Sequence, residues 1–239
     1  MNPTRTAPGK SMAGAFITFE GIDGCGKSTQ LRLLASELRV RGVTVVTTRE
    51  PGGTPLGQRL RAALLDVQEQ VDPLAELLVF AADRAQHVRK HLRPSLEANQ
   101  VVLSDRYADA TVAYQGAGRG FEPKLIQDIV QLATDGLRPG LTLLFDLSVA
   151  ESAVRTHRRV ESRRTDRLDI EDAEFHTRVR NAYLEIAKAE PARIRVIDAR
   201  GSVQETHEAV MNIVMPFLKA RGLVGEEQRA KGRVPSSEA

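Results

Sequence analysis

The sequence predicts an α/β fold, a three-layer αβα sandwich in which a five-stranded parallel sheet lies between two layers of helices. Five short apolar runs, rich in Val, Ile, Leu, Thr and Phe, are typical of strands that are buried on both faces. Amphipathic patterns lie between these runs, and strands that alternate with helices favour a parallel sheet. The predicted strands span residues 15–21, 43–50, 100–106, 141–147 and 193–199.

The helices are predicted from their periodicity and from residues that are typical of helix ends. Gly42 is expected to end the helix that begins at Lys27, because glycine readily adopts the left-handed conformation found there. Asp72 is a candidate N-cap, and Pro73 fits the first helical position. The predicted helices span residues 27–42, 72–92, 122–136, 171–190 and 202–220.

A single domain is expected over residues 15–221. The flanking segments, residues 1–14 and 222–239, are rich in Gly, Pro, Ser and Ala, so they are predicted to be disordered tails. The formal net charge is +3, but residues 1–14 carry +2 and residues 219–239 carry +2, which leaves −1 for the centre. Because the excess charge lies at the ends, a basic face for nucleic acid is not expected.

The composition also bears on the cellular compartment. No apolar run approaches the roughly 18 to 20 residues of a membrane-spanning helix, and the first residues lack the apolar region of a secretory signal. The one cysteine, Cys25, permits no intrachain disulfide. The chain is therefore expected in the reducing cytoplasm, without a membrane partner. Cys25 is interpreted as a small loop residue, since no catalytic His/Asp context accompanies it.

A glycine-rich segment follows the first predicted strand and precedes the first predicted helix. Its residues, GIDGCGKST, match the phosphate-binding pattern G-x-x-x-x-G-K-[ST] and predict a P-loop NTPase-type fold. Glycines let backbone N–H groups turn inward around a phosphate, and the helix N-terminus favours an anion. Lys27 is expected to reach the β- and γ-phosphates of ATP, and Ser28 to bind Mg²⁺. The expected ATP-binding residues are Gly21, Ile22, Asp23, Gly24, Cys25, Gly26, Lys27, Ser28 and Thr29.

A magnesium site needs a carboxylate near the hydroxyl of the phosphate loop. Asp105 and Asp146 both lie at the ends of predicted strands. Asp105 is favoured because an arginine follows it, which suits a site crowded with phosphates. His87 and His91 are four residues apart on one predicted helix, but no third ligand with suitable spacing accompanies them, so a metal site is not expected there.

Five motifs resemble those of the bacterial thymidylate kinases (dTMP kinases), and they occur in the order and at the spacing found in that family. The resemblance runs from about Ala15 to Leu218. It implies phosphoryl transfer from MgATP to dTMP, giving ADP and dTDP, by a P-loop kinase that is usually a homodimer. The alternatives are a P-loop kinase for another deoxynucleotide or a nucleoside, and a non-catalytic ATP-dependent P-loop module. The motifs are FEGIDGCGKST, TREPGGTPLG, FAADRAQH, SDRYADATVAYQGAGRG and DRLDIEDAEFHTRV.

The resemblance assigns four residues to the phosphate and sugar of dTMP. Arg49 and Arg106 would hold the phosphate, because two guanidinium forks can grip and neutralise it. Tyr114 would lie near the sugar and disfavour a ribose 2′-OH. Asp23, the one acidic residue of the phosphate loop, would accept a hydrogen bond from the 3′-OH.

Four further residues would contact the thymine base. Phe80 would stack on the ring, and Arg84, four residues later on the same helix, would donate to a thymine carbonyl. Thr111 and Gln115 are also four residues apart, and the Gln115 amide can both donate and accept at the N3–H edge.

An arginine-rich segment, residues 155–169, is interpreted as a lid over the active site. The phosphate loop has no basic residue at its variable positions, so the resemblance implies that the lid supplies the missing cation. Arg163 or Arg164 is expected to be inserted, with Arg158 as the alternative. The expected catalytic residues are Lys27, Arg106, Arg163 and Arg164. Two more residues are assigned to the adenine pocket, Arg200 and Val203.

Overall fold

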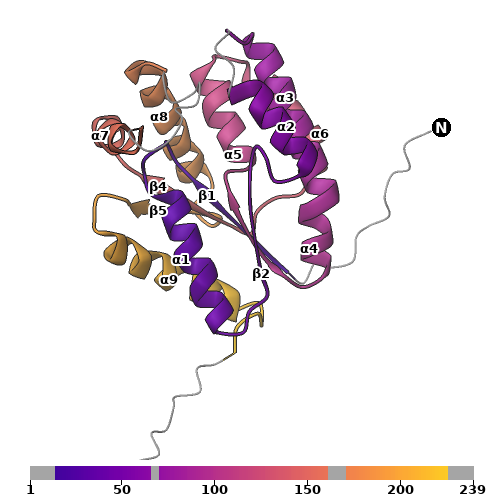
Figure 1. Cartoon of the computed structure of the whole chain (residues 1–239), viewed down its shortest axis with the longest axis vertical. Coiled ribbons are helices and arrows are strands. Elements are labelled where there is room, and N and C mark those ends of the chain that lie inside the picture. The colour runs from indigo at the N-terminus through magenta and orange to yellow at the C-terminus, as the bar shows by residue number, and fades with distance from the viewer. Residues whose placement is uncertain (1–13, 66–69, 161–170, 226–239) are drawn as a thin grey trace, which may run out of the picture.

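A single parallel sheet forms the centre of the protein in the computed structural model, which describes residues 14–65, 70–160 and 171–225. Its strand order is β2-β3-β1-β4-β5 (Figure 1). All four neighbouring pairs are parallel, so the predicted sheet is confirmed. The strands are β1 (Ala15–Glu20), β2 (Val45–Arg49), β3 (Val101–Asp105), β4 (Leu141–Asp146) and β5 (Ile194–Asp198).

Helices connect successive strands and confirm the five predicted helices, with further helical segments that were not predicted. The helices that follow β1 and β2 are α1 (Lys27–Val40), α2 (Pro55–Leu65), α3 (Pro73–His87) and α4 (Arg93–Glu97). Those that follow β3 are α5 (Ala108–Thr111) and α6 (Pro123–Thr134). The remaining α-helices are α7 (Val149–Val160), α8 (Ala173–Ala189) and α9 (Val203–Lys219). Two π-helical segments continue α3 and α5, namely η1 (Val88–Leu92) and η2 (Val112–Gly118).

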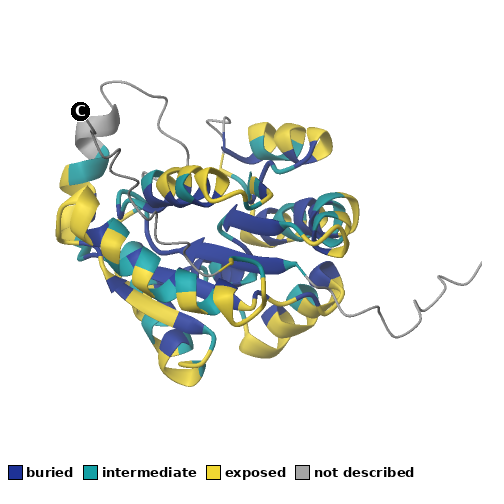
Figure 2. Cartoon of the chain, turned by 90° about the horizontal axis from the view of Figure 1, so that it is seen from below, coloured by how far each residue is buried: buried dark blue, intermediate teal, exposed yellow. Residues whose placement is uncertain are grey.

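The helices form one layer on each face of the sheet (Figure 1). On one face, α1 and α9 enclose a core with alternate residues of the strands, such as Ile17, Leu103 and Leu143. On the other face, η1 and α4 cover β3, whereas η2 and α8 cover β4 and β5. The three central strands β1, β3 and β4 are consequently buried almost throughout, whereas the edge strands β2 and β5 and the outer helix faces carry exposed residues (Figure 2). Burial on both faces explains why the sequences of the central strands are nearly continuous apolar runs.

Local sequence signals begin and end the helices as predicted. The Asp72 side chain accepts hydrogen bonds from two backbone N–H groups at the start of α3. Gly42 has φ +78° after α1, and its N–H and that of Val43 donate to carbonyls of the last turn. This is a Schellman ending, which satisfies carbonyls that the helix leaves unpaired.

The helix predicted over residues 72–92 is longer and less regular in the structure. It widens into η1 and continues as α4. Pro94 explains the widening, because it lacks an N–H and its ring would clash with a carbonyl of the preceding α-helical turn. A π-helical turn shifts the hydrogen-bond register and lets the helix pass the proline.

Residues just outside the predicted domain limits of 15–221 also contact the domain. The Gly14 N–H donates to the Leu96 carbonyl, and Leu223 and Val224 pack against the core formed with α1 and α9. Within the described part of the chain, none of the helices combines the length and the apolar character that a bilayer span requires.

The strand order determines where a ligand can bind. The chain leaves the central strand β1 toward β2 on one side, whereas β4 and β5 lie on the other side. In such sheets ligands bind beyond the carboxyl ends of the strands at the point where the direction of winding changes. The register places Arg49 and Phe19 opposite Asp105 at this edge. The phosphate loop therefore begins in the middle of the predicted site.

Candidate active site

The phosphate loop lies between β1 and α1, and its glycines are required by its shape. Gly21 has φ +133°, and a Cβ there would lie 2.5 Å from the Phe145 carbonyl oxygen. Gly24 has φ +77°, and a Cβ there would meet Ser152 and Thr156 of α7 at 2.9 and 2.8 Å. Side chains at these positions would displace β4 and α7, so the loop needs glycine for close packing as well as for its backbone conformation.

Lys27 folds back over the loop that precedes it. Its Nζ donates to the carbonyl oxygens of Gly21 and Ile22 at 2.9 and 2.8 Å. It also lies 3.9 Å from an Asp23 carboxylate oxygen and 3.6 Å from the Cys25 sulfur. The ammonium group is therefore held inside the loop. Burial raises the pKa of the Cys25 thiol, which keeps that side chain from acting as a thiolate nucleophile.

Ser28 and Asp105 form a hydroxyl–carboxylate pair at the same edge of the sheet. The Ser28 hydroxyl donates to Asp105 Oδ2 at 2.6 Å. One hydroxyl and one carboxylate fit Mg²⁺, which prefers oxygen ligands and usually takes few from the protein and the rest from phosphates and water. Asp146 fits less well, because both its carboxylate oxygens accept from Arg180, at 2.7 and 2.9 Å.

The two histidines of α3 and η1 are arranged for packing. The His87 and His91 rings stack with their centroids 5.6 Å apart. Both ring nitrogens of His87 are engaged, Nδ1 with Glu50 at 2.8 Å and Nε2 with Thr48 at 2.7 Å. Neither nitrogen of His87 is available to a metal.

Asp23 and Arg106 form an ion pair beside the phosphate loop. The NH2 group of Arg106 lies 2.8 Å from each Asp23 carboxylate oxygen, and its NH1 group donates to the Gly21 carbonyl at 3.1 Å. The Tyr114 hydroxyl lies 3.0 Å from Arg106 NH2 and donates to Asp23 at 3.3 Å. Although burial acts to raise it, the pKa of Asp23 is held well below its usual range by the charges of Arg106 and Lys27. The negative charge in the loop is thus compensated by two cations.

The residues predicted to contact the base come from α3 and from α5 with η2. Arg84 NH1 donates to the Thr111 hydroxyl at 2.8 Å, which brings the two helical segments together. Gln115 is buried, and its amide donates to Glu76 of α3 at 2.8 Å. Phe80 is only half-buried, so its ring is not part of the described core clusters. Arg49 is exposed at the end of β2, where its guanidinium lies beside Gly52.

Comparison with known proteins identifies the family of the chain. The sequence profile of the family described as thymidylate kinase matches residues 19–210. The chain belongs to the thymidylate kinase family. It is 51% identical over 186 residues to the thymidylate kinase of Deinococcus radiodurans, an alignment that covers 78% of this chain and 89% of that protein. It is 48% identical over 209 residues to that of Geotalea uraniireducens, covering 86% and 98%. The crystal structure of thymidylate kinase from Ehrlichia chaffeensis is similar with a TM-score of 0.70 at 38% identity, covering 84% of this chain and 98% of that one.

The segment predicted as a lid of this thymidylate kinase family member begins inside a helix. α7 runs to Val160, so the first residues of the segment 155–169 are helical. Arg155 on this helix donates to the Ala199 carbonyl at 2.9 Å, and the Ser152 hydroxyl donates to the Asp23 carbonyl. α7 therefore supports the phosphate loop. Arg163 and Arg164 lie outside the described residues, as does the side chain of Arg158.

The two residues that the sequence analysis assigns to an adenine pocket follow β5, with Arg200 before α9 and Val203 at its first position. The Arg200 side chain binds Asp198, with the NH2 group 2.6 Å from Oδ2. The Val203 side chain is exposed, and its carbonyl accepts from Gln30 of α1 at 2.8 Å. Among the described residues, no contact joins the Arg200 or Val203 side chain to the phosphate loop.

Buried polar residues that the sequence analysis did not single out support the candidate site. Glu50 follows Arg49 and accepts from Arg84 at 2.8 Å. Asp83 accepts the Gly52 N–H at 3.1 Å and so holds the turn that carries Arg49. The Tyr183 hydroxyl, which lies beside Arg106, donates to Glu20 Oε2 at 2.8 Å. For Glu20 and Glu50 the available signal was a charged residue at the end of an apolar strand or directly after it, since such a charge needs a partner.

Proposed function

We propose that the protein transfers the γ-phosphoryl group of ATP to dTMP, giving ADP and dTDP for DNA synthesis in the cytoplasm. The proposal rests on the phosphate loop, where the groups expected to bind the donor meet those expected to bind the acceptor. Its backbone and Lys27 suit the phosphates of a donor, whereas its side chain Asp23 is turned to Arg106, the predicted holder of the acceptor's phosphate. Membership of the thymidylate kinase family supports dTMP as the acceptor.

Each group of the site has a role that its chemistry explains. Lys27 and the loop N–H groups stabilise charge on the donor phosphates as the γ-phosphoryl group leaves. Arg106 and Arg49 hold the dTMP phosphate in line, and no strong base is needed because that phosphate is already anionic. Mg²⁺, held by Ser28 and Asp105, would neutralise part of the charge on the ATP phosphates. Arg163 or Arg164 would supply a further cation at the transferring group.

A substrate panel tests the proposal directly. ADP release is measured in a coupled assay with dTMP, dUMP, dCMP, GMP and thymidine as acceptors. We expect dTMP to give the highest kcat/KM. Equal or better turnover of a non-thymine acceptor would favour another nucleotide kinase, and ATP binding without transfer to any acceptor would favour a non-catalytic module.

Asp23 provides a sharper test of how the acceptor is bound. Asp23→Ala is expected to raise KM for dTMP about 10- to 100-fold, because a hydrogen bond to a charged group contributes roughly 1.5–3 kcal/mol. The matched substrate is the 3′-deoxy analogue of dTMP, which lacks the hydroxyl that Asp23 is proposed to bind. Steady-state kinetics with both acceptors should show that the variant no longer prefers dTMP. If the preference survived, Asp23 would act only as the partner of Arg106.

The thymidylate kinase is further proposed to form a homodimer. α2 and α6 both pack against α3, and these three helices expose several large apolar side chains. Burying such residues between two copies removes apolar surface from water. Light scattering coupled to size-exclusion chromatography should give twice the chain mass of 26.2 kDa. The exposed residues are Leu56, Leu74, Leu78, Leu125 and Leu132.

A further inference from the structure

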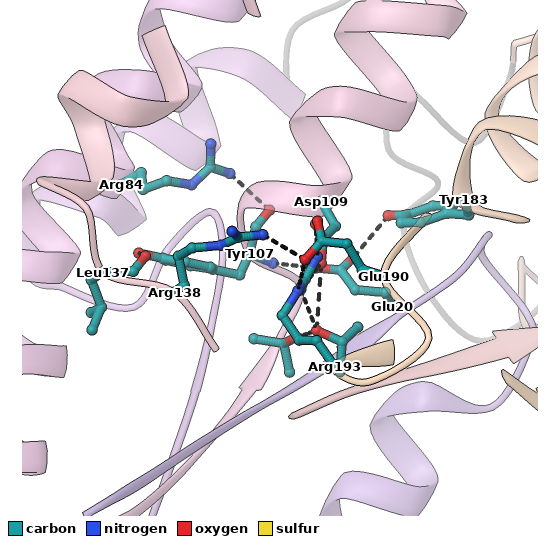
Figure 3. A network of polar contacts seen from close by, with 11 residues as sticks. Glu20, Arg84, Tyr107, Asp109, Leu137, Arg138, Tyr183, Glu190 and Arg193 are labelled. Carbon is teal, nitrogen blue, oxygen red and sulfur yellow. Dashed lines mark hydrogen bonds and ion pairs between the residues drawn. The ribbon is translucent and has the colours of Figure 1, made fainter. Parts of the chain in front are cut away.

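Glu20, the last residue of β1, is a fully buried carboxylate with two partners from distant parts of the chain. Its Oε1 accepts the Tyr107 backbone N–H at 2.7 Å. Its Oε2 accepts the Tyr183 hydroxyl of α8 at 2.8 Å (Figure 3). Both partners lie next to Arg106. Tyr107 follows it in the chain, and the Tyr183 hydroxyl lies near its side chain.

These contacts close a ring around Arg106. Arg106 NH1 lies 3.4 Å from the Tyr183 hydroxyl, which in turn donates to Glu20. The Arg106 backbone has φ +70°, a left-handed conformation that a non-glycine residue adopts only when its surroundings enforce it. The enforcement is visible at Tyr107, whose N–H is held by Glu20 and whose carbonyl accepts from Arg84 at 3.0 Å (Figure 3).

The carboxylate at position 20 is costly for the fold. Burial, followed by the charge of Asp109, raises the pKa of Glu20 to about 7, while Arg106 and the hydrogen bonds from Tyr183 and Tyr107 act to lower it. A buried charge of this kind weakens the fold at neutral pH. Arg193 is paired with Asp109, with contacts of 2.7 and 2.9 Å, and does not bind Glu20. This cost is offset by the role of Glu20 in holding the Tyr107 N–H and the Tyr183 hydroxyl.

We propose that Glu20 and Tyr183 are positioning residues for Arg106, which they hold in the left-handed turn and at the side-chain position from which it binds the acceptor's phosphate. This inference rests on the proposed function, because Arg106 is the residue assigned there to the dTMP phosphate. Neither Glu20 nor Tyr183 needs to touch the acceptor.

Equilibrium binding of two ligands isolates the contribution of the phosphate. Calorimetry is used to measure Kd for dTMP and for thymidine, and their ratio reports how much the phosphate adds to binding. We expect wild type to bind dTMP at least about tenfold more tightly than thymidine, since charge-assisted contacts are strong. Glu20→Gln and Tyr183→Phe should each lower this ratio about three- to tenfold and leave Kd for thymidine within about twofold.

The matched control lies on the same strand. Thr18 is buried two residues before Glu20, and its hydroxyl binds Thr142 at 2.8 Å without contacting Arg106. Thr18→Val therefore removes one buried hydrogen bond and should lower the melting temperature while keeping the ratio of the two Kd values. If Glu20→Gln fails to fold, Tyr183→Phe decides, because it removes only one oxygen atom.

A double variant shows whether the effect passes through Arg106. In an Arg106→Ala background, Tyr183→Phe should change the ratio by less than about twofold, because the group it positions is gone. An equal loss in both backgrounds would overturn the inference. So would a wild-type ratio that both single variants preserve, and in that case the proposed function stands. If wild type bound thymidine as tightly as dTMP, the inference and the proposed role of Arg106 would fail together.

Discussion

Lys27→Ala is expected to lower kcat for dTMP phosphorylation about 10²- to 10³-fold, while the fold survives. The Lys27 ammonium already lies inside the phosphate loop, bound to two of its carbonyl oxygens. It is thus in place before charge develops on the transferring group, and such preorganised cations act mainly in the transition state. The measurement is kcat and KM in the coupled ADP assay, together with urea unfolding of both proteins.

The control for this prediction removes the same charge elsewhere. Lys219 is exposed at the end of α9, so Lys219→Ala should leave kcat unchanged. A purely structural role of Lys27 would be recognised by a different pattern: unfolding at lower urea with kcat preserved in the folded fraction. Retention of kcat in a folded Lys27→Ala protein would contradict the proposed role.

The sheet was predictable because its central strands are buried on both faces, which gives short apolar runs bounded by polar residues. All five strands lie within the predicted ranges. α2 was missed because it directly follows the Gly-rich turn 51–54. Pro55 at its first position and the Thr54 hydroxyl, which accepts the Gly57 N–H at 3.0 Å, were the signals of its start.

The site was predictable to the extent that its residues are local or lie at strand ends. The phosphate loop is one continuous segment, and Ser28 meets Asp105 because parallel strands place their carboxyl ends at one edge. The supporting residues could not be derived in this way. Glu20 and Tyr183 are 163 positions apart, and which partner satisfies a buried charge depends on how α8 packs.

Arg84→Ala is expected to destabilise the fold by about 3–5 kcal/mol, because it leaves the Glu50 carboxylate buried without its cation. The Arg84 and Glu50 side chains are both 3% exposed, with Nε 2.8 Å from Oε2. KM for dTMP should also rise more than KM for ATP, since Arg84 is proposed to contact thymine. Urea unfolding and steady-state kinetics measure the two effects separately, and an equal rise in both KM values would count against the thymine contact.

Two comparison variants separate the ion pair from general loss of contacts. Arg138 forms an ion pair with Glu190 but is 65% exposed, so Arg138→Ala should change stability by no more than about 1 kcal/mol. Glu50→Gln in the Arg84→Ala background should restore part of the lost stability, because the neutral amide no longer needs a cation. A double variant that is less stable than Arg84→Ala alone would contradict this explanation.

The pH dependence gives an independent test of the same ion pair. In wild type, burial acts to raise the pKa of Glu50, but Arg84 and His87 hold it below its usual range. A carboxyl group whose pKa is lower in the folded state contributes stability above its unfolded pKa and loses it as the pH falls. Without Arg84 the effect of burial gains weight and protonation of Glu50 becomes favourable for the fold. The stability difference between wild type and Arg84→Ala should therefore shrink between pH 7 and about pH 5. A constant difference over this range would show that the buried carboxylate is not the cause.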